Sequence, residues 1–342
     1  VMISIRSNFF YTRSVPCELW FFDRNKPENR RDKTLMLDCR NIFRKVTRKI
    51  FDFSPEQMQN ISAIVWLYRG QHERFLQLMQ RYLQKICIES AAVSDVVAPF
   101  NKMLTDMCGK YAVYAGSIKA VKTKHDKSGT WSEAHTELNE AVTLFQNDQN
   151  HLLRAIADFL KQYQSKVPGS NELQHRMRIK FDPIVEAGRG LIKQADLIYK
   201  LVSKVNDSIS EISSDESMAV DYDRKAASKQ IKQFDELRKS VVNQLKCLVY
   251  FHKQVVWLQD RFPKAELQDV AGLVKLVTRK DIEAADWSLT PGRYVGVAPQ
   301  EEDENFDFEA TMRDIHNELK ELNTESMKLA EKIQKNFEEL GI

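Results

Sequence analysis

Three runs of apolar residues near the start of the chain predict β-strands. They cover residues 1–5, 15–22 and 34–39, with a polar loop over residues 23–33. The second and third runs are apolar almost without interruption, as in strands that are buried on both faces of an α/β sheet. Three strands cannot close such a sheet alone, so we expect its remaining strands to lie upstream of Val1.

At Ser54 the apolar pattern changes to helical spacing. The tetrapeptide Ser-Pro-Glu-Gln at 54–57 combines an N-cap serine, a proline at the first helical position and a glutamine at the third. Apolar residues follow at intervals of three and four as far as Tyr68. A second helix is predicted over about 71–88.

From residue 90 to about 256 the pattern is typical of long amphipathic helices. We predict breaks at Ala98-Pro99, at 126–130 and at 167–171, and a further helix break at Pro183 within 181–184. Residues 208–217 are rich in serine and acidic residues, which indicates a surface loop or a frayed helix end.

Residues 267–279 predict another amphipathic helix, and residues 286–297 a compact segment with a Thr-Pro-Gly turn. Within that segment Trp287, Arg293 and Tyr294 form either a patch facing a partner or a packed turn with the two aromatic rings as its core. The burial preferences of Trp and Tyr favour the packed turn.

The last element follows an acidic linker at 301–304 and has a narrow apolar stripe. Its apolar residues recur mostly every three or four positions and include Ile315, Leu319, Leu322, Leu329 and Ile333. This spacing predicts a coiled-coil-like helix that packs against another helix. The acidic flank of the helix disfavours DNA, so the expected partner is protein. Packing onto the chain's own helices is the alternative.

Composition narrows the class of protein. The chain has 342 residues, of which 43% are hydrophobic and 29% charged, and its longest apolar run, residues 61–68, is too short to cross a bilayer. Its five scattered cysteines indicate reduced thiols in a cytoplasmic protein. We therefore expect a mainly helical, globular protein without membrane spans.

Charge is distributed unevenly along the chain. Residues 1–85 hold 16 Lys and Arg against 8 Asp and Glu, a net charge of +8, whereas residues 301–342 hold 5 against 13, a net charge of −8. The two ends are therefore expected to face different partners.

Catalytic and metal-binding motifs are missing from the printed sequence. It contains no phosphate-binding or dinucleotide-binding glycine motif, no HExxH and no GxSxG, and its seven histidines lie singly. No catalytic residue and no metal site is predicted within this chain.

Two segments far apart in the sequence carry a specific pattern. The first runs Asn-Phe-Phe-Tyr-Thr-Arg-Ser-Val-Pro-Cys-Glu-Leu-Trp-Phe-Phe over 8–22 and continues with Leu-Met-Leu-Asp-Cys-Arg-Asn over 35–41. The second, at 281–295, includes Asp-Trp-Ser-Leu-Thr-Pro-Gly-Arg-Tyr-Val. Together they closely resemble the modification subunit of type I restriction-modification systems, an N6-adenine DNA methyltransferase that uses S-adenosylmethionine.

The resemblance implies a fold and a set of partners. The fold would be mainly α, with the terminal strands of a Rossmann-like α/β methyltransferase sheet, a long helical region and a C-terminal coiled-coil-like helix. S-adenosylmethionine would be bound by residues upstream of Val1, as would the catalytic Asn-Pro-Pro-aromatic motif, so this chain would be a fragment that does not methylate DNA alone. DNA, a specificity subunit and a restriction subunit would be its partners.

On this basis the chain divides into five parts. They are the methyltransferase strands (1–53), a helical extension (54–85), an inserted helical region without family resemblance (86–246), a helical and turn segment (247–300), and the acidic linker with the pairing helix (301–342). A non-enzymatic helical interaction or scaffold protein is the competing class, because about half of the chain is amphipathic helix without chemistry.

The aromatic run at 9–11 is the part of this chain closest to the chemistry. By its place five residues before Val15, Phe10 matches the aromatic residue that stacks on the flipped adenine in related adenine methyltransferases. A hydrophobic plug between loop and strand is the alternative for Phe9, Phe10 and Tyr11.

Basic side chains crowd the same part of the sequence. Cations within reach of phosphates give sequence-independent affinity for DNA. The candidates for contact with the DNA backbone are Arg6, Arg13, Arg24, Lys26, Arg44 and Arg48. A solvated charged surface is the alternative for any one of them.

Overall fold

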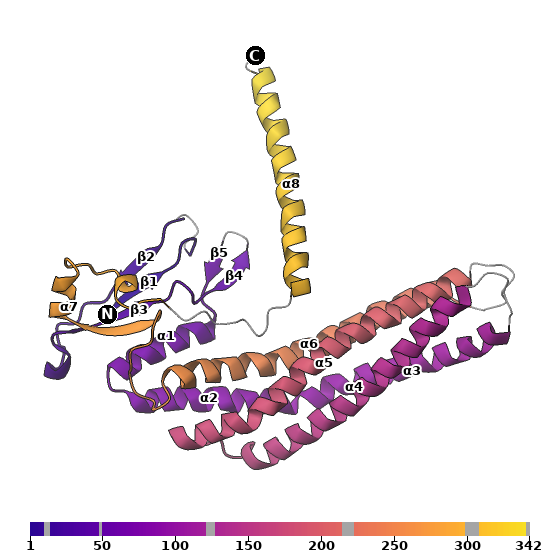
Figure 1. The fold of residues 1–342 in the computed structure, drawn as a ribbon, viewed down its shortest axis with the longest axis horizontal. Helices are drawn as coiled ribbons and strands as arrows, with labels where there is room; N and C mark the ends of the chain where they lie inside the picture. Colours follow the sequence, from indigo (N-terminus) through magenta and orange to yellow (C-terminus); the bar gives the residue numbers. More distant parts are fainter. Residues whose placement is uncertain (10–13, 48–49, 121–126, 214–221, 298–307, 340–342) are drawn as a thin grey trace. The chain divides into compact units, whose positions relative to one another are not determined.

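The computed structural model describes residues 1–9, 14–47, 50–120, 127–213, 222–297 and 308–339. It divides into two compact units, Val1–Gly296 and Val297–Ile342 (Figure 1). The first unit holds a small mixed sheet and a large helical part, and the second holds one helix. The described chain is therefore mainly helical.

Four strands form the main sheet of the first unit. They are β1 (Met2–Ile5), β2 (Cys17–Trp20), β3 (Lys33–Asp38) and β6 (Val274–Thr278), in the order β2-β1-β3-β6. Strands β1 and β3 are parallel, and the two outer strands are antiparallel to their neighbours. The first three predicted runs are confirmed as strands.

Strand β6 corrects the helix predicted over 267–279. Val274 and Val277 are buried while Lys275 and Thr278 are exposed, and this strand pairs with the edge of β3. The Asp38 N–H also donates to the Leu273 carbonyl at 2.7 Å. Pairing with β3 satisfies backbone groups that an open sheet edge would leave exposed. The stabilisation from this long-range pairing outweighs the local preference for a helix.

The predicted burial of the strands holds for one run and not for another. Leu35, Met36 and Leu37 of β3 are fully buried, as expected. The run at 15–22 is not buried on both faces, because β2 lies at an edge of the sheet and Trp20 and Phe22 are 51% and 82% exposed. The two rings contact each other edge to face, with their centroids 6.4 Å apart.

A second, two-stranded sheet follows, formed by β4 (Arg44–Thr47) and β5 (Ile50–Asp52). Helix α1 (Pro55–Tyr68) begins directly afterwards with the predicted capping box: the Gln57 N–H donates to the Ser54 hydroxyl and the Gln57 side chain accepts from the Ser54 N–H. Gly70, with φ of 74°, separates α1 from α2 (His72–Ala91). Both predicted helices are confirmed.

Four long helices complete the first unit: α3 (Val93–Ala120), α4 (Lys127–Tyr163), α5 (Asn171–Ile212) and α6 (Arg224–Arg261). Helix α5 packs between α4 and α6, and α3 and α2 pack on α6 (Figure 1). One continuous hydrophobic core runs from β1 and β3 through these helices. The helical part is therefore anchored to the sheet.

Two predicted helix breaks are wrong, and both fall at prolines. Pro99 lies inside α3 and Pro183 inside α5. Each is next to or near a fully buried ring, Phe100 and Phe181. Burying these rings in the bundle compensates for the roughly 3 kcal/mol that an internal proline costs a helix.

Of the other predicted interruptions, the one at 167–171 is confirmed and those at 126–130 and 208–217 are contradicted where the structure describes them. The break at 167–171 is confirmed between α4 and α5. Of the break at 126–130, residues 127–130 already belong to α4, and residue 126 lies outside the described residues. Helix α5 continues to Ile212, so residues 208–212 are helical, while 214–217 lie outside the described residues.

A small second core lies on the opposite face of the sheet. Helix α7 (Arg279–Ala284) and the short 3-10 helix η2 (Pro291–Arg293) cover it. Tyr294 packs on this core, which confirms half of the packed-turn prediction. Trp287 is 55% exposed at a φ of 58°, so it does not belong to a turn core.

The second unit consists of α8 (Phe308–Glu339). Its predicted apolar stripe is exposed within that unit, including Ile315, Leu319, Leu322, Leu329 and Ile333. Among all helices that the structure describes, none has the length and apolar character needed to cross a membrane.

Candidate nucleic-acid interface

The predicted base-stacking residue Phe10 follows β1 in the sequence and lies outside the described residues, as does Arg13. The residues before it, Asn8 and Phe9, are described. Asn8 adopts a φ of 61° and its carbonyl accepts from the Phe51 N–H at 3.2 Å. The Phe9 ring lies 4.4 Å from the ring of Phe53, centroid to centroid. Phe9 thus fits the plug interpretation, and stacking by Phe10 stays a prediction.

Arg6 is held between two aromatic rings. Its guanidinium lies 3.8 Å from the centroid of Phe43 and 3.9 Å from that of Phe51, and its Nε is buried without a hydrogen-bond partner among the described residues. This contact ties β1 to the small β4–β5 sheet. Among the predicted phosphate contacts that the structure describes, Arg6 is therefore the one most engaged in packing.

Arg44 faces Asp52 across the β4–β5 ladder. Its Nε and Nη2 donate to the two carboxylate oxygens at 2.8 and 2.6 Å. This bidentate pair lowers the pKa of Asp52 and raises the pKa of Arg44 from their ordinary values. The pair is exposed but already neutralised, and Arg48 lies outside the described residues.

The loop between β2 and β3 places cations next to the end of α1. Arg24 is exposed, and the Lys26 ammonium donates to the Lys33 carbonyl at 2.8 Å. The Tyr68 hydroxyl donates to the same carbonyl at 3.1 Å, and the Arg30 guanidinium lies 5.2 Å from the centroid of the Tyr68 ring. This loop and the C-terminal end of α1 therefore form one basic surface.

The two family-like segments meet in space. Asp38 at the end of β3 accepts from the Nε and Nη2 of Arg40, with a shortest distance of 2.6 Å. That guanidinium lies against η2, where a Cβ at Gly292 would come within 2.5 Å of Arg40 Nη2. A side chain at residue 292 would displace the end of the Arg40 side chain, so the Asp-Cys-Arg and Thr-Pro-Gly-Arg-Tyr motifs lie in contact.

A groove that the sequence did not predict lies between α1 and α2. Its volume is about 640 Å³, and its lining includes Trp66, Arg74 and Arg81. The signal was present in the sequence, because Arg74 and Arg81 are seven residues apart and so lie on one helical face. Among the described residues, no group of three or more His, Cys, Asp or Glu side chains is placed to hold a metal ion.

The structure also places the cysteines. All five are free thiols; Cys39 and Cys87 are buried, and the other three are partly buried. Burial raises the pKa of Cys87 to about 11. A buried thiol that stays protonated is not a nucleophile, so Cys87 contributes packing alone.

Comparison with known proteins agrees with the family resemblance over one part of the chain. Residues 1–96 match the family model described as N-6 DNA Methylase. The chain is 40% identical over 74 residues to the type I restriction enzyme HindI methylase subunit of Haemophilus influenzae, covering 22% of this chain and 16% of that protein. It is 40% identical over 70 residues to the type I restriction enzyme MjaIX methylase subunit of Methanocaldococcus jannaschii, covering 20% and 12%. No solved structure matches the chain.

Residues 1–96 therefore resemble the N-6 DNA methylase family, and the resemblance to the modification subunit of type I restriction-modification systems is confirmed over this part of the chain. The matches span less than a fifth of either relative. The second family-like segment, at 281–295, lies outside the residues that the family model covers. Its connection with the first rests on the contact between Arg40 and Gly292.

Proposed function

We propose that this chain is the C-terminal part of a type I modification subunit that transfers a methyl group from S-adenosylmethionine to N6 of adenine in DNA. The observation that carries the proposal is the family match at 1–96, which coincides with β1–β3 and with the helices α1 and α2. The contact of Asp38 and Arg40 with the second family-like segment supports it. The sheet would then be the end of a Rossmann-like methyltransferase sheet.

The described residues do not fit the methyl donor. In open sheets of this kind ligands bind beyond the carboxyl ends of the parallel strands, where a carboxylate often holds a ribose. Strand β3 ends at Asp38, but its carboxylate is already bound by Arg40 and by the Arg40 N–H. We therefore assign donor binding and the methyl-transfer step to residues upstream of Val1.

The outer edge of β2 supports this extension. The strand is paired on one side only, and Leu19, Trp20, Phe21 and Phe22 are exposed. An edge strand with unpaired backbone groups and exposed apolar side chains is a template for pairing with a further strand, although β2 itself has only four residues. Strands from the upstream part of the subunit would cover this edge and the exposed rings.

Partners follow from the same proposal. DNA would contact the basic surface of residues 1–85, with Phe10 stacking on the flipped adenine. The exposed stripe of α8, from Ile315 to Ile333, would dock on a helix of the specificity subunit as a short coiled coil. A restriction subunit would join for cleavage, and the complex would work in the cytoplasm.

The coding sequence upstream of Val1 tests this proposal directly. An Asn-Pro-Pro-Tyr or Asn-Pro-Pro-Phe motif within the preceding hundred or so residues, the scale of one domain, is the expected result. A start codon directly before Val1 would contradict the proposal. That result would favour a non-enzymatic helical interaction protein, for which the long bundle of α3–α6 is the supporting observation.

A further inference from the structure

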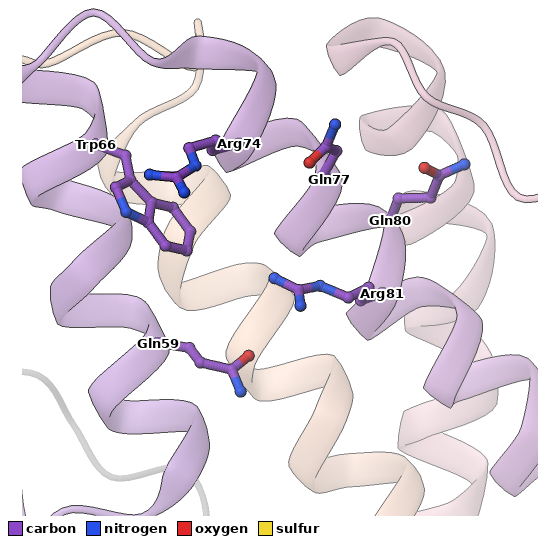
Figure 2. Close-up of a pocket in the computed structure, with 6 residues that line it drawn as sticks. All are labelled: Gln59, Trp66, Arg74, Gln77, Gln80 and Arg81. Carbon is purple, nitrogen blue, oxygen red and sulfur yellow. The ribbon is translucent and has the colours of Figure 1, made fainter.

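The groove between α1 and α2 combines cations, amides and one aromatic ring. It is lined by Gln59 and Trp66 of α1 and by Arg74, Gln77, Gln80 and Arg81 of α2. Figure 2 shows both guanidinium groups extending from α2 toward α1, with Trp66 and Gln59 on the facing helix. None of these six side chains is a carboxylate, so the lining is positively charged.

The two arginines are kept available for an outside anion. The Arg74 guanidinium lies 5.4 Å from the centroid of the Trp66 ring and donates to the Gln71 side chain at 3.1 Å. Within the described part of the chain, neither Arg74 nor Arg81 forms an ion pair, in contrast to Arg40, Arg44 and Arg238. A stacked guanidinium is fixed in orientation without losing its charge.

The spacing of the two arginines fits an extended anion rather than a single one. Seven residues correspond to two helical turns, or about 10 Å along the axis of α2. A phosphodiester chain presents repeated charges over such a length, and guanidinium groups bind phosphate oxygens through paired hydrogen bonds. Glutamine amides commonly donate to phosphate and sugar oxygens, and Gln59 and Gln77 line the same groove. The third glutamine, Gln80, already donates to the Val167 carbonyl at 2.9 Å.

The groove continues the basic surface of the loop between β2 and β3. Arg30 lies over Tyr68, the last residue of α1, and Arg69 follows as the exposed C-cap. Burial lowers the pKa of the Val1 amine most, Lys26 and Arg69 lower it further, and Asp23 raises it. Cations thus lie on both sides of the turn between α1 and α2, with Arg69 at the end of α1 and Arg74 near the start of α2.

We propose that the α1–α2 groove binds the phosphodiester backbone of DNA outside the target base, with Arg74 and Arg81 as phosphate contacts and Trp66 positioning Arg74. The proposal rests on the proposed function and extends it to residues outside the sheet. An acidic protein segment is less well matched, because protein interfaces need apolar anchors at their centre and Arg74 covers the one aromatic ring of this groove.

Fluorescence anisotropy of the chain with a labelled duplex over roughly 50–200 mM salt tests the proposal. The double variant Arg74→Gln, Arg81→Gln should bind DNA about tenfold more weakly at low salt. The slope of log affinity against log salt should fall by about 2. The control, Arg154→Gln with Lys161→Gln, removes the same charge from exposed positions of α4 and should leave both quantities nearly unchanged. Arg74→Lys with Arg81→Lys should restore the slope.

Three results would overturn the groove assignment. They are equal losses in the groove and control variants, no loss in the groove variant, and no DNA binding by the unchanged chain at low salt. If the groove variant instead lost binding to a poly-glutamate peptide while DNA binding stayed intact, an acidic protein would be the partner. Methyl transfer by the complete subunit is measured separately. If methylation fails but the groove variant still loses affinity for DNA, the proposed function is contradicted and the groove assignment stands.

Discussion

Arg40 and Gly292 are in contact although 252 positions separate them in the sequence, and the Arg40 guanidinium occupies the space that a Cβ at residue 292 would need. Asp38 holds that guanidinium through its carboxylate. The contact joins a motif near the start of the chain to one near the end of the first unit. The four-stranded sheet is therefore formed by strands on both sides of the helical region in the sequence: β1–β3 come before it and β6 after it.

Replacing Gly292 by alanine should destabilise the chain by no more than about 1 kcal/mol, because the flexible and half-exposed end of Arg40 must shift and weaken its ion pair with Asp38. The free energy of unfolding in urea measures this loss. Gly169→Ala is a suitable control, since Gly169 lies outside the helices and a Cβ there meets nothing within 4 Å. A loss no greater than that of the control would show that the contact does not hold the two motifs together.

If Phe10 stacks on the flipped adenine, Phe10→Ala in the complete subunit should weaken binding of the flipped base by about 1–3 kcal/mol. The stability of the fold should change little. Fluorescence of 2-aminopurine at the target position reports base flipping alongside the methylation rate. Phe9→Ala is the matched variant and should mainly reduce stability, because its ring packs on Phe53. Large stability loss with unchanged kinetics in Phe10→Ala would support the plug interpretation.

The double variant Leu319→Glu with Leu322→Glu tests the role of α8. Charge in the exposed stripe should abolish co-purification with the specificity subunit while the helical content of the isolated chain stays the same. Lys320→Glu with Thr324→Glu adds carboxylates at exposed positions outside the stripe and should leave assembly intact. Collapse of the isolated chain's own thermal transition would place α8 in the internal core instead.

A pH dependence is expected from His252 in the bundle. Burial lowers the pKa of His252 below its ordinary value, against the opposing effect of Asp182, whose carboxylate lies 2.6 Å from the ring Nε2. Arg178 and Arg189 also act to lower that pKa. Since the unfolded chain binds the proton more readily, stability should be full above about pH 6.5 and fall at lower pH.

Urea unfolding of the chain and of His252→Gln at several values between about pH 5 and pH 8 checks this expectation. The variant should show a shallower loss of unfolding free energy toward acid pH than the unchanged chain. Identical slopes in both proteins would mean that His252 is not the titrating group.

Local signals in the sequence were enough to predict many of the elements. The N-cap Ser54 and the apolar spacing after it located α1, because capping and helix burial depend on residues within a few turns. The local pattern over residues 267–279 predicts a helix, but Val274–Thr278 is a strand. Its stability as a strand depends on pairing with β3, more than two hundred residues away, which a local pattern does not show. Internal prolines were misread for the same reason.

The candidate site shows a similar division. The basic character of residues 1–85 was apparent from the sequence, but the partners of individual arginines were not. Stacking of Arg6 between Phe43 and Phe51 and pairing of Arg44 with Asp52 both depend on the β4–β5 ladder. The groove at Arg74 and Arg81 depends on how α1 and α2 pack, which no local pattern specifies.

Methyl transfer to DNA by the complete subunit is the decisive measurement. The chain joined to its upstream sequence is combined with the specificity subunit, labelled S-adenosylmethionine and duplex DNA, and N6-methyladenine is quantified in the digested product. We predict N6-methyladenine from this complex, and neither methylation nor calorimetrically detectable S-adenosylmethionine binding by the chain alone. A complex that assembles on DNA yet forms no N6-methyladenine, or micromolar binding of the donor by the chain alone, would contradict the proposed function or the upstream location of the donor site respectively.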